Sequence, residues 1–202
     1  MYDLIIRDGT IVRSSGRLVA DIAIEDGKIA YVGGNPAGKA REEISAIGRF
    51  VMPGAIDGHV HFGGTDHPEK ETWSAASRDA VRTGVTTVFD MPSASSPTLD
   101  AEAVDNKLAN AAAASVVNFG VWVGASTGKV AQLSELWDSG KACGTKVFMG
   151  GAPGEMTLDP ETLEQVFSST KGLMAIHAED QSTLDAAHQQ WKEHSSPAHN
   201  DV

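Results

Sequence analysis

The sequence predicts an α/β fold in which about five βα units of a (β/α)8 barrel follow a small sheet of short strands. From residue 51 onward, near-continuous apolar runs alternate with helix-like segments, which is typical of a parallel sheet covered by helices. Before residue 51, short alternating runs flank Asp-Gly pairs, the strongest short-range signal of a β-hairpin. We therefore expect two domains, residues 1–50 and residues 51–202.

The first domain is expected to contain two hairpins, with turns at Asp8-Gly9 and at Asp26-Gly27. Both central residues of such a turn need a positive φ, which favours Asp and Gly there. Two hairpins make a small sheet, but hardly a self-sufficient domain. The expected strands are Asp3–Arg7, Thr10–Arg13, Asp21–Glu25 and Lys28–Val32.

The second domain repeats strand, loop and helix at roughly thirty-residue spacing, as expected for a (β/α)8 barrel of ~250 residues. A doubly wound open sheet is the alternative, but no Gly-x-Gly-x-x-Gly follows the first strand to support a dinucleotide-binding fold. The expected helices cover about residues 72–83, 100–114, 129–139, 159–169 and 181–192. The expected strands are the run ending at His61, then Val85–Phe89, Val116–Val123, Thr145–Met149 and Leu173–His177.

Composition excludes several classes of partner. The chain has 202 residues, 41% of them hydrophobic, which is enough for one sizeable core. Its net charge of −11 argues against nucleic acid or an anionic membrane as a partner. The single cysteine, Cys143, cannot form an intramolecular disulfide and fits a reducing compartment, where we expect it to be a small buried hydrophobe. No signal peptide or membrane span is visible, so the expected location is the cytoplasm.

The first candidate site is the pair His59 and His61, at the end of the apolar run that begins at Val51. Residues two apart in a strand point the same way, so both imidazoles project together from one strand end. Neutral imidazole suits zinc and similar divalent ions. An isolated His-x-His pair is more often two solvated histidines on a turn. Here the preceding strand signal and the further candidate ligands downstream favour a metal site.

Lys146 and His177 are the further candidates, because both lie toward the C-terminal ends of strands, where barrel enzymes place their sites. Lys146 lies in a strand expected to be buried on both faces, where an uncompensated ammonium is costly. It is either a snorkelling or ion-paired lysine, or one whose pKa is depressed so that its neutral amine can form a carbamate with CO2. An ammonium has no acceptor, whereas a carbamate has two oxygens that could bridge two metals. His177 taken alone would more often be a core histidine bonded to backbone.

Four segments resemble the cyclic amidohydrolases of the amidohydrolase superfamily: dihydroorotase, allantoinase and hydantoinase/dihydropyrimidinase. They lie in that family's order and spacing from residue 1 to about residue 195. Jointly they are highly specific, although none would be alone. The segments are Pro53–His61, Gly84–Pro92, Lys146–Gly150 and Ile176–Asp180.

The resemblance implies a zinc enzyme. His59 and His61 would hold one zinc, carbamylated Lys146 would bridge two, and His177 would hold the second. The N-terminal strands resemble part of the small β-sandwich that accompanies the barrel in this family. In the chemistry implied, the metals lower the pKa of a water that attacks a ring amide carbonyl, and one metal polarises that carbonyl.

The sequence departs from the family at two positions that bear on the substrate. Dihydroorotases of this type carry an Arg two residues after the second histidine and an Asn after Met-Pro, and both grip the substrate carboxylate. Here Gly63 and Ser93 stand at these substrate-binding positions. A bidentate clamp on a carboxylate is lost without the guanidinium, so we expect a neutral cyclic amide or ureide as substrate.

The largest departure is that the family's sixth-strand histidine and its eighth-strand aspartate, the general base, have no counterpart in this chain. The leading hypothesis is therefore the N-terminal portion of a metal-dependent cyclic amidohydrolase, which we expect to be incomplete and inactive by itself. We also expect self-association into a homo-oligomer. The rival hypothesis is a truncated, inactive homologue that serves as an interaction or scaffold module. Open strand edges and apolar helix faces are expected in either case.

Overall fold

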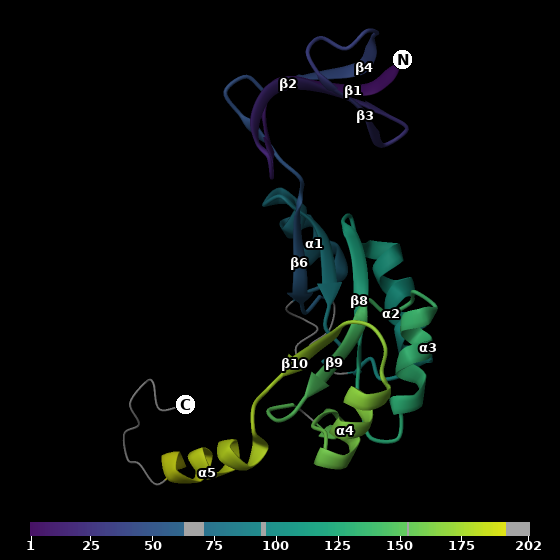
Figure 1. Ribbon diagram of the computed structural model, residues 1–202, viewed down its shortest axis with the longest axis vertical. Coiled ribbons are helices and arrows are strands. Elements are labelled where there is room, and N and C mark those ends of the chain that lie inside the picture. The colour runs from purple at the N-terminus through teal and green to yellow at the C-terminus, as the bar shows by residue number, and fades with distance from the viewer. Residues whose placement is uncertain (63–70, 94–95, 153, 193–202) are drawn as a thin grey trace. The chain divides into compact units, whose positions relative to one another are not determined.

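The computed structural model describes residues 1–62, 71–93, 96–152 and 154–192. The chain divides into two compact units, Met1–Gly54 and Ala55–Val202, and each is described by itself (Figure 1). No helix in these described ranges is both long and apolar enough to cross a membrane.

The N-terminal unit is a five-stranded sheet with the order β3-β2-β1-β4, in which β5 also pairs with β1. The pairs β1–β2 and β2–β3 are antiparallel, whereas β4 and β5 run parallel to β1. Ile11, Ala20 and Ile22 form its buried apolar cluster. This strand-rich sheet fits part of a small β-sandwich. The strands are β1 (Tyr2–Arg13), β2 (Gly16–Glu25), β3 (Lys28–Gly33), β4 (Ala40–Ser45) and β5 (Phe50–Val51).

The two Asp-Gly pairs have different outcomes. The hairpin at Asp26-Gly27 is confirmed: both residues have positive φ, 51° and 70°, and they join β2 to β3. The turn predicted at Asp8-Gly9 is wrong, because β1 continues through it and the chain reverses at residues 14–15 instead. Asp8 does have positive φ, 56°, but it forms a β-bulge in which two residues of β1 oppose Asp21.

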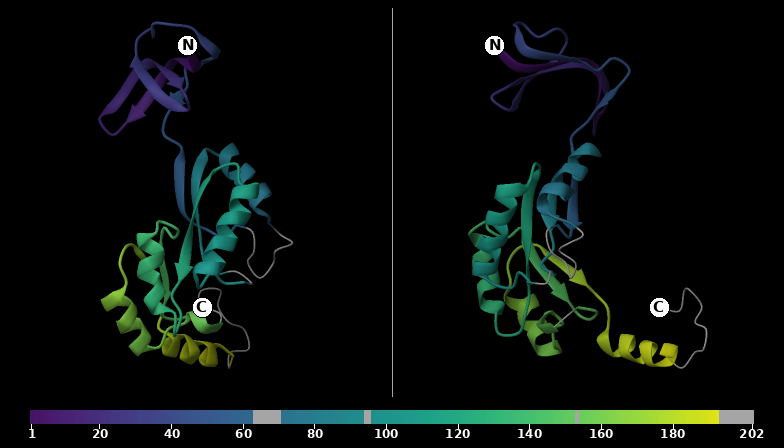
Figure 2. Two further views of the ribbon diagram at one scale, coloured as in Figure 1. Left: turned by 90° about the vertical axis from the view of Figure 1, so that its right-hand side faces the viewer. Right: turned by 180° about the vertical axis from the view of Figure 1, so that it is seen from behind.

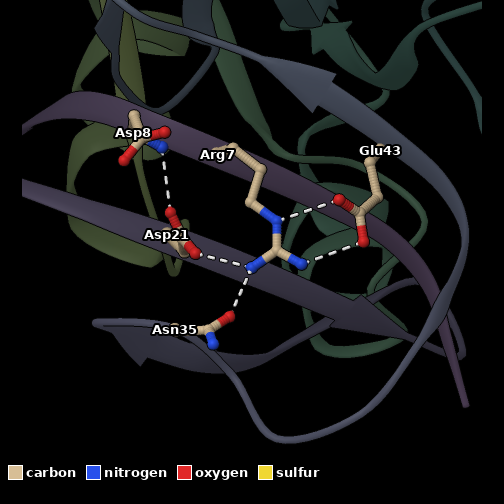
Figure 3. Close-up of polar contacts among 5 residues, drawn as sticks. All are labelled: Arg7, Asp8, Asp21, Asn35 and Glu43. Carbon is tan, nitrogen blue, oxygen red and sulfur yellow. Dashed lines mark hydrogen bonds and ion pairs between the residues drawn. The ribbon is translucent and has the colours of Figure 1, made fainter.

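The bulge is held by one carboxylate and one guanidinium (Figure 3). Asp21 accepts hydrogen bonds from the Asp8 backbone N–H at 2.9 Å and from Arg7 Nη1 at 2.8 Å. Arg7 also makes a bidentate pair with Glu43 on β4, at 3.0 and 2.9 Å, and donates to Asn35 Oδ1. Paired N–H donors on a planar fork match a carboxylate well, so this network fixes the order of β2, β1 and β4.

The second unit is a five-stranded, fully parallel sheet with the order β10-β9-β8-β7-β6. The fold class predicted from the sequence is confirmed: the sheet is part of a (β/α)8 barrel. In this unit, strands and helices alternate along the chain. The strands are β6 (Ala55–Val60), β7 (Val85–Asp90), β8 (Asn118–Gly124), β9 (Gly144–Phe148) and β10 (Met174–His177). The helices are α1 (Trp73–Arg82), α2 (Ala101–Ala114), α3 (Leu133–Asp138), α4 (Pro160–Ser169) and α5 (Gln181–Lys192). Two single-turn 3₁₀ helices, η1 (Val130–Gln132) and η2 (Gly154–Met156), complete the unit.

Local chemistry explains where the helices begin. Thr72, Asp100 and Asp159 cap α1, α2 and α4, since each side chain accepts a hydrogen bond from a first-turn N–H. The segment expected to be one helix at 129–139 is divided into η1 and α3. The main core lies between the sheet and the helices, where Val121, Val123 and Val147 meet apolar residues of α2, α3 and α4.

The sheet has two free edges among the described residues, at β6 and β10. Large apolar side chains are exposed there: Ile56 on β6 is 66% exposed and Ile176 on β10 is 44% exposed. Helix α5 has no buried residue and stands apart from the sheet (Figure 2). These edges match the open edges expected from the sequence.

The Arg7 network predicts a pH-dependent loss of stability in the N-terminal sheet. Arg7 holds the pKa of Glu43 below its usual range, and the Asp8 N–H together with Arg7 does the same for Asp21. A depressed folded-state pKa stabilises the fold above the unfolded value, about 4, and this contribution is lost as pH falls through the folded value. Glu43→Gln should therefore speed hydrogen exchange in β1 and β4 at pH 7, with a smaller effect near pH 3.

The matched control is Glu42→Gln, the same substitution at the exposed neighbouring position on β4. It should leave exchange unchanged at both pH values. Equal effects of the two substitutions at pH 7 would show that the Arg7–Glu43 pair does not stabilise the sheet.

Candidate functional site

His59 and His61 lie on the face of the parallel sheet that the helices do not cover, which we call the inner face. Val60, between them, is buried against Trp73 and Val88 on the helix-covered face. Side chains alternate along a strand, so the residues on either side of Val60 point to the opposite face. The two imidazole ring centroids lie 5.4 Å apart, close enough for both rings to approach one ion. This arrangement is the one that strand alternation predicts for a His-x-His pair.

Lys146 also belongs to the inner face. All five residues of β9 are buried, and Val147 packs into the helix-side core, so Lys146 and Phe148 point the other way. Lys146 is only 4% exposed, and its Nζ lies 5.0 Å from the centroid of the Phe148 ring. No carboxylate in the described part of the chain forms an ion pair with it. Burial lowers the pKa of this amine, which raises the fraction that is neutral and nucleophilic.

His177 reaches the same face from β10. It pairs in register with Phe148 of β9, and the two ring centroids lie 5.6 Å apart. Its Nε2 lies 3.0 Å from Glu179 Oε2. A neutral imidazole that keeps its proton on Nε2, the nitrogen nearer this carboxylate, has its free lone pair on Nδ1. Such a carboxylate–imidazole contact fixes ring orientation in metal sites.

Gly150 and Gly151 allow the loop after β9 to pack against the end of β10. A Cβ on Gly150 would lie 2.6 Å from the Glu179 carbonyl oxygen, and one on Gly151 would lie 2.5 Å from Glu179 Oε2. Gly151 also has φ +70°, and its N–H donates to Gln181 Oε1 at 2.9 Å. Side chains at these two positions would displace Glu179, so the glycines preserve its contact with His177.

The four predicted ligands share one electrostatic environment. The pKa of His59 is lowered first by burial and then by the positive charges of Lys146 and His61, with a smaller contribution from His177. In the ranges that the structure describes, no three His, Cys, Asp or Glu side chains form a metal-binding group. The three histidines therefore do not make such a group by themselves, and a metal held by them would need further ligands. Lys146, a buried amine with no carboxylate partner among the described residues, is a candidate on the same face.

Of the two predicted substrate-binding positions, the structure describes one. Ser93 follows β7 and is half-buried beside buried Met91. Gly63 lies outside the described residues. Their roles stay predictions.

Sequence reasoning assigned no role to Asp90 or Glu179. Asp90 ends β7 and is 1% exposed, with its carboxylate held by the Phe62 N–H and by Lys107. The signal that could have found it is the one that identified Lys146, a charged residue in an otherwise apolar parallel strand. Glu179 belongs to the segment Ile176–Asp180, but its contact with His177 depends on the loop at Gly150 and is not visible in the sequence.

Comparison with known proteins identifies the family to which the second unit is similar. The model of the amidohydrolase family matches residues 50–201. The chain is 40% identical over 191 residues to an allantoinase of Rubrobacter xylanophilus, covering 92% of this chain and 42% of that protein. It is 35% identical over 185 residues to a dihydroorotase of Methanosarcina acetivorans, covering 90% of this chain and 39% of that protein.

Among solved structures, an L-hydantoinase (dihydropyrimidinase) from Arthrobacter aurescens matches with a TM-score of 0.88 at 29% identity. That match covers 97% of this chain and 45% of the other. The chain thus spans about two-fifths of the length of the curated relatives it matches.

The inner-face arrangement predicts that metal binding depends on the histidine pair. After dialysis against zinc and bicarbonate, the His59→Ala/His61→Ala variant should retain far less zinc than the parent, because it lacks two adjacent imidazole ligands. Elemental analysis measures this directly. His188→Ala, which removes an exposed histidine of α5, is the control and should retain the parent content. Unchanged zinc stoichiometry in the double variant would count decisively against the site.

Proposed function

The chain belongs to the amidohydrolase family, and we propose that it forms the N-terminal part of a metal-dependent hydrolase that opens the ring of a cyclic amide. The observation that carries the proposal is Lys146, a buried amine without a carboxylate partner among the described residues, on the same inner face as His59 and His177. Its relatives include an allantoinase and a dihydroorotase, enzymes named for cyclic amides.

Under this proposal, His59 and His61 would hold one zinc, His177 would hold a second, and carbamylated Lys146 would supply oxygen ligands. Bound zinc supplies a lowered pKa for water and polarisation of the amide carbonyl. Glu179, whose Oε2 lies 3.0 Å from His177 Nε2, would orient the ring and leave Nδ1 to bind the metal.

Lys146 becomes a ligand through its own chemistry. Its neutral nitrogen attacks the carbon of CO2, an N–C bond forms, and the electron pair of one C=O bond moves onto oxygen. Loss of one proton from nitrogen leaves a carbamate with a single negative charge. The conversion replaces a buried positive charge with a negative one beside three imidazoles, which removes the repulsion between Lys146 and His59.

The surrounding inner-face residues give the site an apolar wall. Phe148 contacts Lys146 and His177, and Trp122 is buried on β8. The Trp122 Nε1–H donates to the Gly58 carbonyl at 3.1 Å, which ties β8 to the strand carrying His59. An apolar wall limits the access of bulk water to the amine and to the substrate carbonyl.

We propose a neutral ring, such as a cyclic ureide, as the substrate. The glycine at position 63 and the serine at position 93 provide no guanidinium for a substrate carboxylate. The Ser93 hydroxyl could instead donate to or accept from a ring amide.

We further propose that the chain acts within an assembly in the cytoplasm, without nucleic acid or membrane partners. The exposed apolar residues on edge strands β6 and β10 favour self-association into a homo-oligomer, since an unpaired strand edge is a template for pairing.

Ring opening should require more than these 202 residues. The chain alone should show no measurable turnover, since lack of the general base costs ~10²–10⁴ in rate. Joined to the C-terminal part of the Rubrobacter allantoinase, and separately to that of the Methanosarcina dihydroorotase, it should hydrolyse allantoin or hydantoin in preference to dihydroorotate. A preference for dihydroorotate in both chimeras would overturn the neutral-ring assignment.

Two variants of these chimeras test the role of Lys146 and the substrate preference separately. Lys146→Ala should abolish turnover, and full activity in it without an added short-chain carboxylate would exclude the carbamate. Gly63→Arg/Ser93→Asn should raise activity toward dihydroorotate and leave the zinc content unchanged.

A further inference from the structure

Asp90 is a buried carboxylate on the face of the sheet opposite the histidines. Val88 packs in the helix-side core, and Asp90 lies two residues further along β7, so it shares that face. It is 1% exposed, and Lys107 of α2 pairs with its Oδ2 at 2.5 Å. Its other oxygen accepts the backbone N–H of Phe62 at 2.5 Å.

The Lys107 side chain is largely buried, and both of its hydrogen bonds go to the end of β7 and the residue after it. Its side chain is 12% exposed, and its Nζ donates both to Asp90 and to the Met91 carbonyl at 2.8 Å. Burial raises the pKa of Asp90, and the Lys107 ammonium opposes that rise. Well-packed apolar residues often replace a buried ion pair without loss of stability, so a stabilising role is weak grounds for this one. The hydrogen bonds that the Asp90–Lys107 pair makes to the neighbouring backbone indicate a different role.

The pair acts on the end of the strand that carries the histidines. Asp90 lies in register with Val60, and the Met91 N–H donates to the Val60 carbonyl at 2.8 Å. The Asp90 carboxylate binds the N–H of Phe62, two residues later. The backbone of His61 is thus held on both sides, by one hydrogen bond before it and one after it. Lys107 contacts both residues that make these bonds, Asp90 at the end of β7 and Met91 directly after it.

We propose that the Asp90–Lys107 pair is a positioning device for His61, which fixes the strand end so that the imidazole stays beside that of His59. Asp90 holds the Phe62 N–H directly, Met91 holds the Val60 carbonyl, and Lys107 acts through these two residues. The inference rests on the proposed function in one respect, that His61 is a metal ligand.

The test compares three forms of the 202-residue chain with the parent. Lys107→Met removes the ammonium of the Asp90–Lys107 pair. Asp90→Leu/Lys107→Met removes both charges together, so that no uncompensated buried charge remains. Lys141→Met is the matched control, because it also removes a lysine from an ion pair with α2. Lys141 pairs with Asp105 of α2, and this pair is exposed. The readouts are Co²⁺ affinity by equilibrium dialysis, the visible absorption of the bound Co²⁺, the melting temperature, and hydrogen exchange of residues 55–62 without metal.

Both Lys107 variants should bind Co²⁺ more weakly, by on the order of tenfold, with a changed absorption band shape and faster exchange at Phe62. The double variant should melt near the parent temperature, and Lys141→Met should match the parent in every measurement. A changed band shape distinguishes altered ligand geometry from reduced occupancy, which would only scale the spectrum.

Parental affinity and band shape in a folded double variant would overturn the proposal. A parent chain that binds no Co²⁺ would instead contradict the proposed function. Hydrogen exchange then decides the positioning role alone: unchanged exchange at Phe62 in both Lys107 variants would overturn it, and faster exchange there, with parental exchange in β8, would support it.

Discussion

An ammonium in a strand that is buried along its whole length needs a counter-charge, and Lys146 has none among the described residues. The surroundings make this group reactive rather than stable: burial lowers its pKa, and the charge of Lys146 in turn lowers the pKa of His59. In the proposed chemistry, conversion of the amine to a carbamate would relieve the repulsion and provide oxygen ligands beside the imidazoles. The proposed chemistry follows from that electrostatic conflict.

The parallel sheet keeps two kinds of charged residue apart. On the helix-covered face, Asp90 is neutralised by Lys107 and serves the backbone. On the inner face, within the described ranges, Lys146 and the histidines form no ion pair apart from the contact between His177 and Glu179. Alternation of side chains along the strands separates the two groups, since Asp90 shares a face with Val88 and Lys146 points away from the face of Val147. One face can therefore hold the strand end in place while the other supplies the ligands.

Much of this arrangement could be predicted from local sequence. The His59–His61 spacing, the buried lysine and the Asp26-Gly27 hairpin depend on alternation and turn chemistry, which are local properties. The same dipeptide at Asp8-Gly9 forms a bulge instead, because Asp21 binds the Asp8 N–H and Val51 packs where a Cβ on Gly9 would lie. The Asp90–Lys107 pair and the Glu179 contact join residues from different elements. Such contacts appear only once the strands are in register.

Diffraction from crystals of the chain grown with zinc and bicarbonate tests the central claim most directly. The account predicts anomalous scattering at the zinc edge about 2.0–2.1 Å from nitrogens of His59 and His61, with branched density continuing beyond Lys146 Nζ. Zinc bound elsewhere, or a plain amine at Lys146 beside a bound metal, would contradict it.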